Sequence, residues 1–184
     1  VLEKNKLDGI DLDFEWAENE KEYKDYSLAI LKMREVLGDK YLFSVSLHPV
    51  CYKISKEAIE AVDFISLQCY GPSPVRFPIE KYCSDIQMVL EYGIPKEKLV
   101  AGVPFYGVTK DNSKKTEAYF NFVQNGLVTS PAQNEVIYQG DTYVFDGQDN
   151  IRIKTRYAKE QKLKGMMSWD LATDLPLSDS RSLL

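Results

Sequence analysis

The sequence has little of several features that assign proteins to common functional classes. It contains one histidine, His48, without a cysteine or serine partner at the spacing of a catalytic triad, and its three cysteines do not have the spacing of a zinc site. No apolar run is as long as a membrane span, and no glycine-rich phosphate loop follows a strand-like segment. The net charge of −5 excludes the basic footprint of nucleic-acid-binding proteins. We therefore expect no metal, no cofactor, no nucleic-acid partner and no membrane contact.

The cysteines and the first residue leave the cellular compartment open. Cys69 lies inside an apolar segment, where we expect a small core residue. A disulfide between Cys51 and Cys83 is an alternative that the sequence does not decide, because distances cannot be read from spacing. The chain begins at Val1 without an initiator methionine, so the lack of a signal peptide says nothing about secretion.

The residues that are present favour one α/β domain. Of the 184 residues, 44% are hydrophobic, which suffices for one core. Strand-like segments alternate with helical segments, and this alternation predicts a parallel sheet. Strands are expected over 8–14, 41–47, 63–70, 99–105 and 165–169, and helices near 20–37, 55–61, 79–92 and 150–163. Ser55 is the expected N-cap of the second helix, and Gly38 and Gly93 are expected to end the first and the third.

Residues 108–148 interrupt this alternation. We expect a helix near 116–125, followed by a β-hairpin. The hairpin pairs 135–138 with 142–145 around a Gln-Gly-Asp turn. These residues therefore form a small α+β insertion between the last two predicted strands.

The run from Leu7 to Trp16 is the most informative segment. If it is a strand, Asp11, Asp13 and Glu15 share one face at a spacing of roughly 6.7 Å, while apolar side chains occupy the other face and belong in a core. Carboxylates so close together raise at least one pKa, which makes a proton donor near neutral pH. A solvated edge strand and a calcium loop are the alternatives, but an EF-hand requires a different placement of glycine and glutamate.

The run Asp8-Gly9-Ile10-Asp11-Leu12-Asp13-Phe14-Glu15 resembles the signature of glycoside hydrolase family 18, the chitinases and endo-β-N-acetylglucosaminidases, on the fourth strand of its (β/α)8 barrel. Three further segments resemble the sixth, seventh and eighth strands of that family in the same order. They are 63–70 (DFISLQCY), 99–107 (LVAGVPFYG) and 165–171 (GMMSWDL). The resemblance covers the chain from end to end.

This resemblance implies that residues 1–184 form a partial TIM barrel, with units four to eight and without the first three. We favour a piece of a longer chain. Studied alone, such a piece is expected to self-associate through its exposed barrel edges. Secretion, the periplasm or the cell surface is the location that the resemblance implies.

The resemblance also assigns roles to the acids. Glu15 matches the general acid of the family. Asp13 matches the acid that orients the substrate's N-acetyl group, whose carbonyl attacks the anomeric carbon and forms an oxazolinium intermediate with retention of configuration. Asp11 would share a proton with Asp13, so that the pair titrates as a unit. Asp8 is expected to be structural.

Aromatic and polar residues on the other strands complete the implied site. Tyr70 matches the catalytic tyrosine that binds the acetamide, and Gln68 points to the same face. Trp169 matches the floor beneath the reacting sugar, and Tyr106 matches a substrate contact. The alternatives are a polar barrel residue for Gln68 and a core tryptophan for Trp169. Gly71 departs from the aspartate or asparagine that many chitinases carry, which removes a hydrogen bond to the sugar.

The function implied is hydrolysis of β-1,4-linked N-acetylglucosamine in chitin or chito-oligosaccharides. Cleavage of the chitobiose core of N-glycans is the nearest alternative, because the segment Gln-x-Tyr-Gly departs from the commoner chitinase form. A lectin that binds sugar without cutting it is a second alternative, although such proteins typically lose the acid that Glu15 matches. The third is an inert fragment.

Overall fold

A parallel five-stranded sheet is the main layer of the computed structural model, which describes residues 1–71, 77–111 and 115–184. Its strands are β1 (Gly9–Asp13), β2 (Leu42–Leu47), β3 (Phe64–Leu67), β4 (Leu99–Pro104) and β9 (Gly165–Trp169). They are hydrogen-bonded in the order β1-β2-β3-β4-β9, and every pair is parallel. Each strand lies within one of the five ranges expected from the sequence, so the predicted α/β alternation is confirmed.

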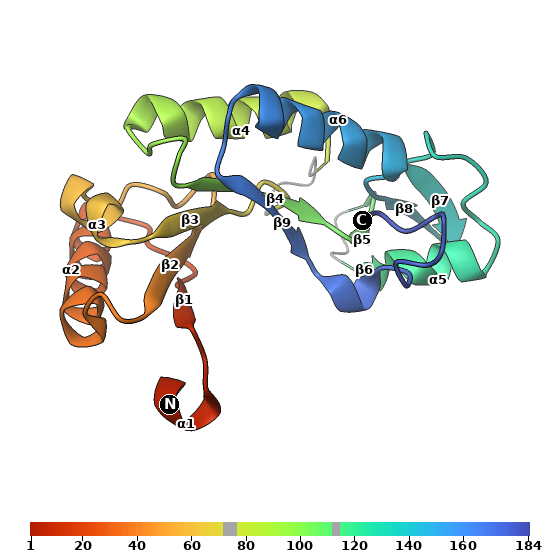
Figure 1. Ribbon diagram of the computed structural model, residues 1–184. Helices are drawn as coiled ribbons and strands as arrows, with labels where there is room; N and C mark the ends of the chain where they lie inside the picture. Colours follow the sequence, from red (N-terminus) through yellow and green to blue (C-terminus); the bar gives the residue numbers. More distant parts are fainter. Residues whose placement is uncertain (72–76, 112–114) are drawn as a thin grey trace.

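Four helices connect these strands and lie on one side of the curved sheet (Figure 1). They are α2 (Glu20–Leu37), α3 (Lys56–Ala61), α4 (Ile79–Tyr92) and α6 (Gln148–Glu160). As predicted, Ser55 caps α3 by accepting a hydrogen bond from the amide of Ala58, and α2 and α4 end at Gly38 and Gly93. Both glycines have positive φ, 58° and 114°, which a residue without Cβ adopts at little cost.

The core lies between the sheet and these helices, and strand alternation decides which residues enter it. On β2, Phe43, Val45 and Leu47 are buried in the core cluster, so Ser44 and Ser46 point to the opposite face. We call this opposite face, turned away from the four helices, the inner face.

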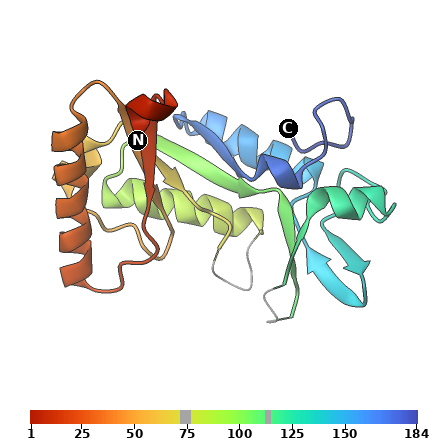
Figure 2. The ribbon, with the colours of Figure 1, turned by 90° about the horizontal axis from the view of Figure 1, so that it is seen from below.

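An antiparallel sheet forms a second layer beside the first (Figure 2). It contains β5 (Tyr106–Thr109), β6 (Thr116–Ala118), β7 (Glu135–Tyr138) and β8 (Asp141–Val144), in the order β6-β5-β8-β7, and helix α5 (Tyr119–Gln124) follows β6. The predicted hairpin is confirmed as β7 and β8. Its turn uses Gln139 and Gly140, with φ of 51° and 88°, which suits the twist of paired strands.

Three parts of the fold differ from the sequence expectation. The helix expected near 116–125 begins at Tyr119, because residues 116–118 pair with β5 as a strand. The strand β5 was not expected; it is four residues long and pairs with the three-residue strand β6 and with β8, which lies much further along the chain. Two short helical elements, α1 (Leu2–Asn5) and η1 (Leu171–Thr173), were also not foreseen.

The apolar face of β1 is less buried than its composition suggested. Leu12 packs against the core, but Ile10 and Phe14 are exposed, although the Phe14 ring lies 5.1 Å from that of Tyr26 on α2. The expectation that this whole face belongs in the core was therefore wrong. The reason is that β1 is an edge strand with a single neighbour, β2, in the described structure.

The three cysteines are free thiols, so the alternative of a Cys51–Cys83 disulfide is wrong. Cys69 is buried in the core, as expected, and its burial raises its pKa. Cys51 is also buried, and its Sγ accepts a hydrogen bond of 3.1 Å from the amide of Ala17. This contact ties the segment after β1 to the segment after β2.

Candidate active site

Asp11 lies on the inner face of β1 and is held by two serine hydroxyls of β2. Ser44 donates to Oδ1 at 2.5 Å and Ser46 donates to Oδ2 at 2.8 Å. The parallel register brings them together, because Asp11 is paired with Ser44 and Asp13 with Ser46. Both carboxylate oxygens of Asp11 are therefore engaged by the neighbouring strand.

Asp13 follows on the same face and is bound differently. Its Oδ1 accepts a hydrogen bond of 3.1 Å from the side-chain amide of Gln68, just beyond β3. Partial burial raises the pKa of Asp13, and the negative charges of Glu15 and Asp11 raise it further, against the opposing effect of the Gln68 hydrogen bond. The negative charges of the acidic row thus contribute to the raised pKa of Asp13, although burial is the larger cause.

Glu15 lies just beyond the last residue of β1 and is exposed. The next residue, Trp16, packs edge-on against His48 with 4.6 Å between the ring centroids. His48 is buried at the end of β2. This aromatic contact and the Cys51–Ala17 hydrogen bond fix the backbone that follows Glu15, so the carboxylate extends from a well-anchored segment.

Tyr70 is buried beyond the end of β3 and joins the two sheets. Its ring packs edge-to-face against that of Tyr106 on β5, with 6.3 Å between centroids, and its hydroxyl lies 3.8 Å from the sulfur of Met167. Burial raises the pKa of Tyr70, and the nearby charges of Asp13 and Glu15 add to this effect. The phenol is therefore protonated at neutral pH and can donate a hydrogen bond.

Trp169 and Gly71 occupy the rim of the inner face. Trp169 ends the edge strand β9 and is 55% exposed, so it lies outside the core clusters of this chain. At Gly71, an added Cβ would lie 3.2 Å from Nε2 of His48. A side chain at position 71 would therefore require a small movement of this histidine.

The structure brings four of the sequence-predicted residues into direct contact, in the pairs Asp13 with Gln68 and Tyr70 with Tyr106. Trp169 lies on the opposite edge strand. Sequence reasoning missed Ser44 and Ser46. Their signal was the alternation of serine with apolar residues in Leu-Phe-Ser-Val-Ser-Leu, next to an acidic strand.

Asp11 contacts Ser44 and Ser46, whereas Asp13 contacts Gln68. The sharing of a proton between the two acids stays a prediction. Their coupling is electrostatic, through the effect of the Asp11 charge on Asp13.

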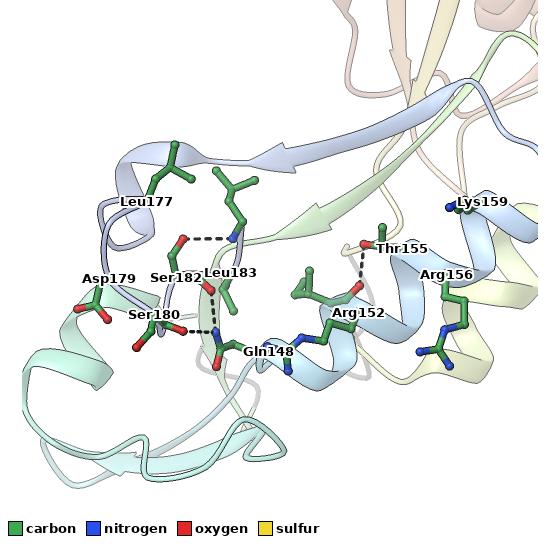
Figure 3. Close-up of a pocket in the computed structure, with 12 residues that line it drawn as sticks. Gln148, Arg152, Thr155, Arg156, Lys159, Leu177, Asp179, Ser180, Ser182 and Leu183 are labelled. Atoms are coloured by element: carbon green, nitrogen blue, oxygen red, sulfur yellow. Dashed lines mark hydrogen bonds between the residues drawn. The ribbon is translucent and has the colours of Figure 1, made fainter.

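A separate hollow of about 610 Å³ lies between α6 and the C-terminal segment (Figure 3). Gln148 crosses it and donates hydrogen bonds of 2.9 Å to the carbonyl oxygens of Ser180 and Ser182. None of the sequence-predicted site residues lines it. Within residues 1–71, 77–111 and 115–184, no group of three His, Cys, Asp or Glu side chains could hold a metal ion, and no helix is long and apolar enough to cross a membrane.

Comparison with solved structures identifies the fold. A GH18 chitinase, ChiB, from the chitin utilization locus of Flavobacterium johnsoniae is 27% identical, with a TM-score of 0.77 over 94% of this chain and 57% of that one. A chitinase from Bacteroides thetaiotaomicron is 21% identical, with a TM-score of 0.84 over 99% and 62%. A GH18 chitinase from Cycas revoluta, solved in complex with (GlcNAc)3, is 18% identical, with a TM-score of 0.75 over 95% and 66%.

Sequence comparison agrees with the structural likeness. A probable chitinase 2 of Drosophila melanogaster is 23% identical over 94% of this chain, which spans 49% of that protein. The chain thus spans about half the length of this curated relative. The family described as glycosyl hydrolases family 18 matches residues 1–174, nearly the whole sequence. The chain therefore belongs to glycosyl hydrolase family 18.

Proposed function

We propose that this chain carries the catalytic carboxylates of a retaining glycosidase that cleaves β-1,4-linked N-acetylglucosamine in chitin or chito-oligosaccharides. The observation that supports this most is the acidic row on the inner face of β1. Asp13 in that row has an elevated pKa and accepts a hydrogen bond from Gln68. The charge of Asp13 in turn contributes to the raised pKa of the protonated Tyr70. In this proposal, residues 1–184 are units four to eight of a barrel, and 108–148 is its insertion.

The proposed chemistry assigns one task to each acid. Glu15, exposed beyond the strand end, gives its proton to the glycosidic oxygen as the bond to the anomeric carbon breaks. The carbonyl oxygen of the substrate's own acetamide attacks that carbon and forms an oxazolinium ion. Asp13 accepts a hydrogen bond from the acetamide N–H and stabilises the developing positive charge. Water then opens the oxazolinium while the Glu15 carboxylate takes up its proton, so configuration is retained.

The remaining residues bind and orient the sugar. The Tyr70 phenol donates a hydrogen bond to the acetamide oxygen, because burial keeps it protonated. Gln68 orients Asp13, and Tyr106 supports the Tyr70 ring. Trp169, which exposes more than half of its surface, offers an indole face on which the apolar side of a sugar stacks.

The first test compares the wild-type chain with Glu15→Gln on chitotetraose, measuring released oligomers by mass spectrometry and binding by tryptophan fluorescence. We expect hydrolysis by the wild type, and loss of hydrolysis with retained binding in the variant. Equal turnover in the two proteins would contradict the role of Glu15. A folded wild-type chain that neither binds nor cleaves chitotetraose would contradict the proposed function, and cleavage of a chitobiose-core glycopeptide alone would change the substrate to N-glycans.

A further inference from the structure

The orientation of the Tyr70 ring depends on the packing around it. Its hydroxyl meets the sulfur of Met167 at 3.8 Å, and a thioether is a weak acceptor. At Gly102 of β4, an added Cβ would lie 2.8 Å from Cε1 of Tyr70, so the ring lies against the backbone of this strand. The ring of Tyr106 packs edge-on against it from β5. The direction in which the phenol points therefore depends on where Tyr106 stands.

Tyr106 in turn packs against a further aromatic ring, that of Phe77. Phe77 lies two residues before α4, and the two ring centroids are 6.4 Å apart, with an interplanar angle of 82°. Phe77 is 5% exposed and belongs to a small buried cluster with Tyr70 and Val108. Because edge-to-face pairs have a preferred geometry, a fixed ring restricts the ring that packs against it. Phe77 therefore limits the positions that Tyr106 can take.

A buried charge holds Phe77. The ammonium group of Lys154 lies 6.0 Å from the centroid of the Phe77 ring, at a distance where a cation and an aromatic face attract each other. Asp146 fixes this ammonium group at 2.5 Å, and the side chains of the ion pair are 1% and 0% exposed. Such an attraction is stronger in a desolvated position than at the surface. The ion pair is therefore a fixed support for the ring, on the side chains of α6 and of the segment before it.

We propose that Phe77 is a positioning residue of the candidate active site, which orients the Tyr70 phenol through Tyr106. The ion pair of Lys154 and Asp146 holds Phe77 in place for this task. The inference rests on the proposed function for the role of Tyr70. In that function the phenol donates a hydrogen bond to the acetamide oxygen that attacks the anomeric carbon, so the direction of the phenol decides whether its proton reaches that oxygen.

The main variant is Phe77→Leu, which removes the ring and keeps an apolar side chain. On chitotetraose we expect kcat to fall about tenfold, because a small displacement of a group that contacts the reacting atoms slows the reaction strongly. KM should change by less than about twofold, since Phe77 does not contact the sugar in this proposal. If Phe77→Leu does not fold, Phe77→Met carries the same prediction, because methionine fills irregular space without a ring.

The matched control is Phe43→Leu. Phe43 is 0% exposed and lies on the helix side of β2, in the core cluster that does not include Phe77. Its loss should lower the midpoint of urea unfolding and leave kcat of the folded protein unchanged. The comparison therefore separates a defect in positioning from a general loss of core packing.

A second readout measures geometry and does not depend on turnover. Tyr70 Cε1 and Met167 Cε lie 2.8 Å and 3.1 Å from the point where a Cβ of Gly102 would stand. In protein labelled with ¹³C at the methionine methyl groups, Met167 should therefore show a nuclear Overhauser effect to the Tyr70 ring, with Met167→Leu and Tyr70→Phe assigning the signals. Phe77→Leu should weaken this effect, and Phe43→Leu should not.

Two further comparisons test the contacts on either side of Phe77. Tyr106→Leu removes the intermediate ring, so adding Phe77→Leu to it should lower kcat by less than about twofold more. A further tenfold loss would overturn the route through Tyr106. Lys154→Met should weaken the Overhauser effect, whereas Lys21→Met, in an exposed ion pair, should not. An unchanged effect in folded Lys154→Met would overturn the support by the ion pair.

The inference as a whole would be overturned by a folded Phe77→Leu variant with the kcat and the Overhauser effect of the wild type. It would also be overturned if Phe43→Leu reduced both quantities equally. A wild-type chain without turnover or binding of chitotetraose would refute the proposed function. The Overhauser effect would then still decide whether Phe77 orients Tyr70, so the two failures are distinguishable.

Discussion

The buried ion pair between Lys154 and Asp146 gives the sharpest prediction about stability. Lys154 Nζ lies 2.5 Å from Oδ2 of Asp146, and their side chains are only 1% and 0% exposed. Asn150 donates to the other oxygen of Asp146, and the lysine ammonium lies 6.0 Å and 5.4 Å from the ring centroids of Phe77 and Tyr82. The pair joins α6 to the end of the antiparallel sheet and to α4.

The change to make is Lys154→Met, which keeps the length of the side chain and removes its charge. Asp146 is then left as a buried carboxyl with Asn150 as its remaining hydrogen-bond partner. Removing one partner of a buried pair costs about 3–5 kcal/mol of unfolding free energy. With an m-value of about 2 kcal/mol/M in urea, the midpoint should fall by about 1.5–2.5 M.

Two variants control for the substitution itself. Lys21→Met makes the same change in a pair of nearly equal length, 2.6 Å, whose lysine is 83% exposed, and we expect little change in the urea midpoint. The double variant Lys154→Met/Asp146→Asn leaves no buried charge and should recover at least half of the loss. Circular dichroism follows unfolding in all three.

The reasoning would be refuted if Lys154→Met and Lys21→Met lowered the midpoint equally. It would also be refuted if the double variant were as unstable as the sum of its single changes, because the cost would then not come from an unpaired buried charge.

Two further predictions concern the inner face. Burial and the charges of Glu15 and Asp11 raise the pKa of Asp13, so its ionisation opposes folding as pH rises above the usual aspartate range. Asp13→Asn should therefore raise the urea midpoint near pH 7. At about pH 3 the acid is protonated in the folded and the unfolded state, so the substitution should leave the midpoint unchanged. Equal changes of the midpoint at the two pH values would contradict the elevated pKa. Trp169→Ala should weaken chitotriose binding by about 1–3 kcal/mol in calorimetry. The free energy of unfolding should change little, because the side chain is 55% exposed. An unchanged Kd would exclude stacking on the sugar.

The sequence was sufficient for the parallel sheet because its signals are local. Five short strand-like segments and the glycines that end α2 and α4 can be recognised from nearby residues, and all five strands were found within their expected ranges. The row formed by Asp11 and Asp13 also follows from alternation alone, which places them on one face of β1.

Part of the antiparallel sheet was harder to predict than its hairpin, because the pairing of β5 with β8 is not local. Strand β5 pairs with residues 116–118 on one side and with β8 on the other, so its context lies up to dozens of residues away in the sequence. A three-residue strand such as β6 is too short to show periodicity. The predicted helix therefore included residues 116–118, which form β6, before the true start of α5 at Tyr119.

The site was partly predictable for a related reason. The acids and the aromatic residues are chemically conspicuous, whereas Ser44 and Ser46 become informative only through the register that sets them beside Asp11 and Asp13. The burial of the first strand's apolar face was overestimated because edge position is a property of the assembled sheet. Neither the pairing register of a strand nor its position at the edge of the sheet can be predicted from the sequence of that strand alone.

If the proposed function holds, the order of the strands bears on the size of the sugar that the site accepts. The carboxylates stand on β1 and the indole of Trp169 on β9, the two outermost strands, with β2, β3 and β4 between them. In the proposed function, the distance between the acids and the indole therefore depends on how strongly the intervening strands bend, and the sheet is visibly curved in Figure 1. Core side chains on the helix side of these strands are expected to influence this distance without contacting the sugar.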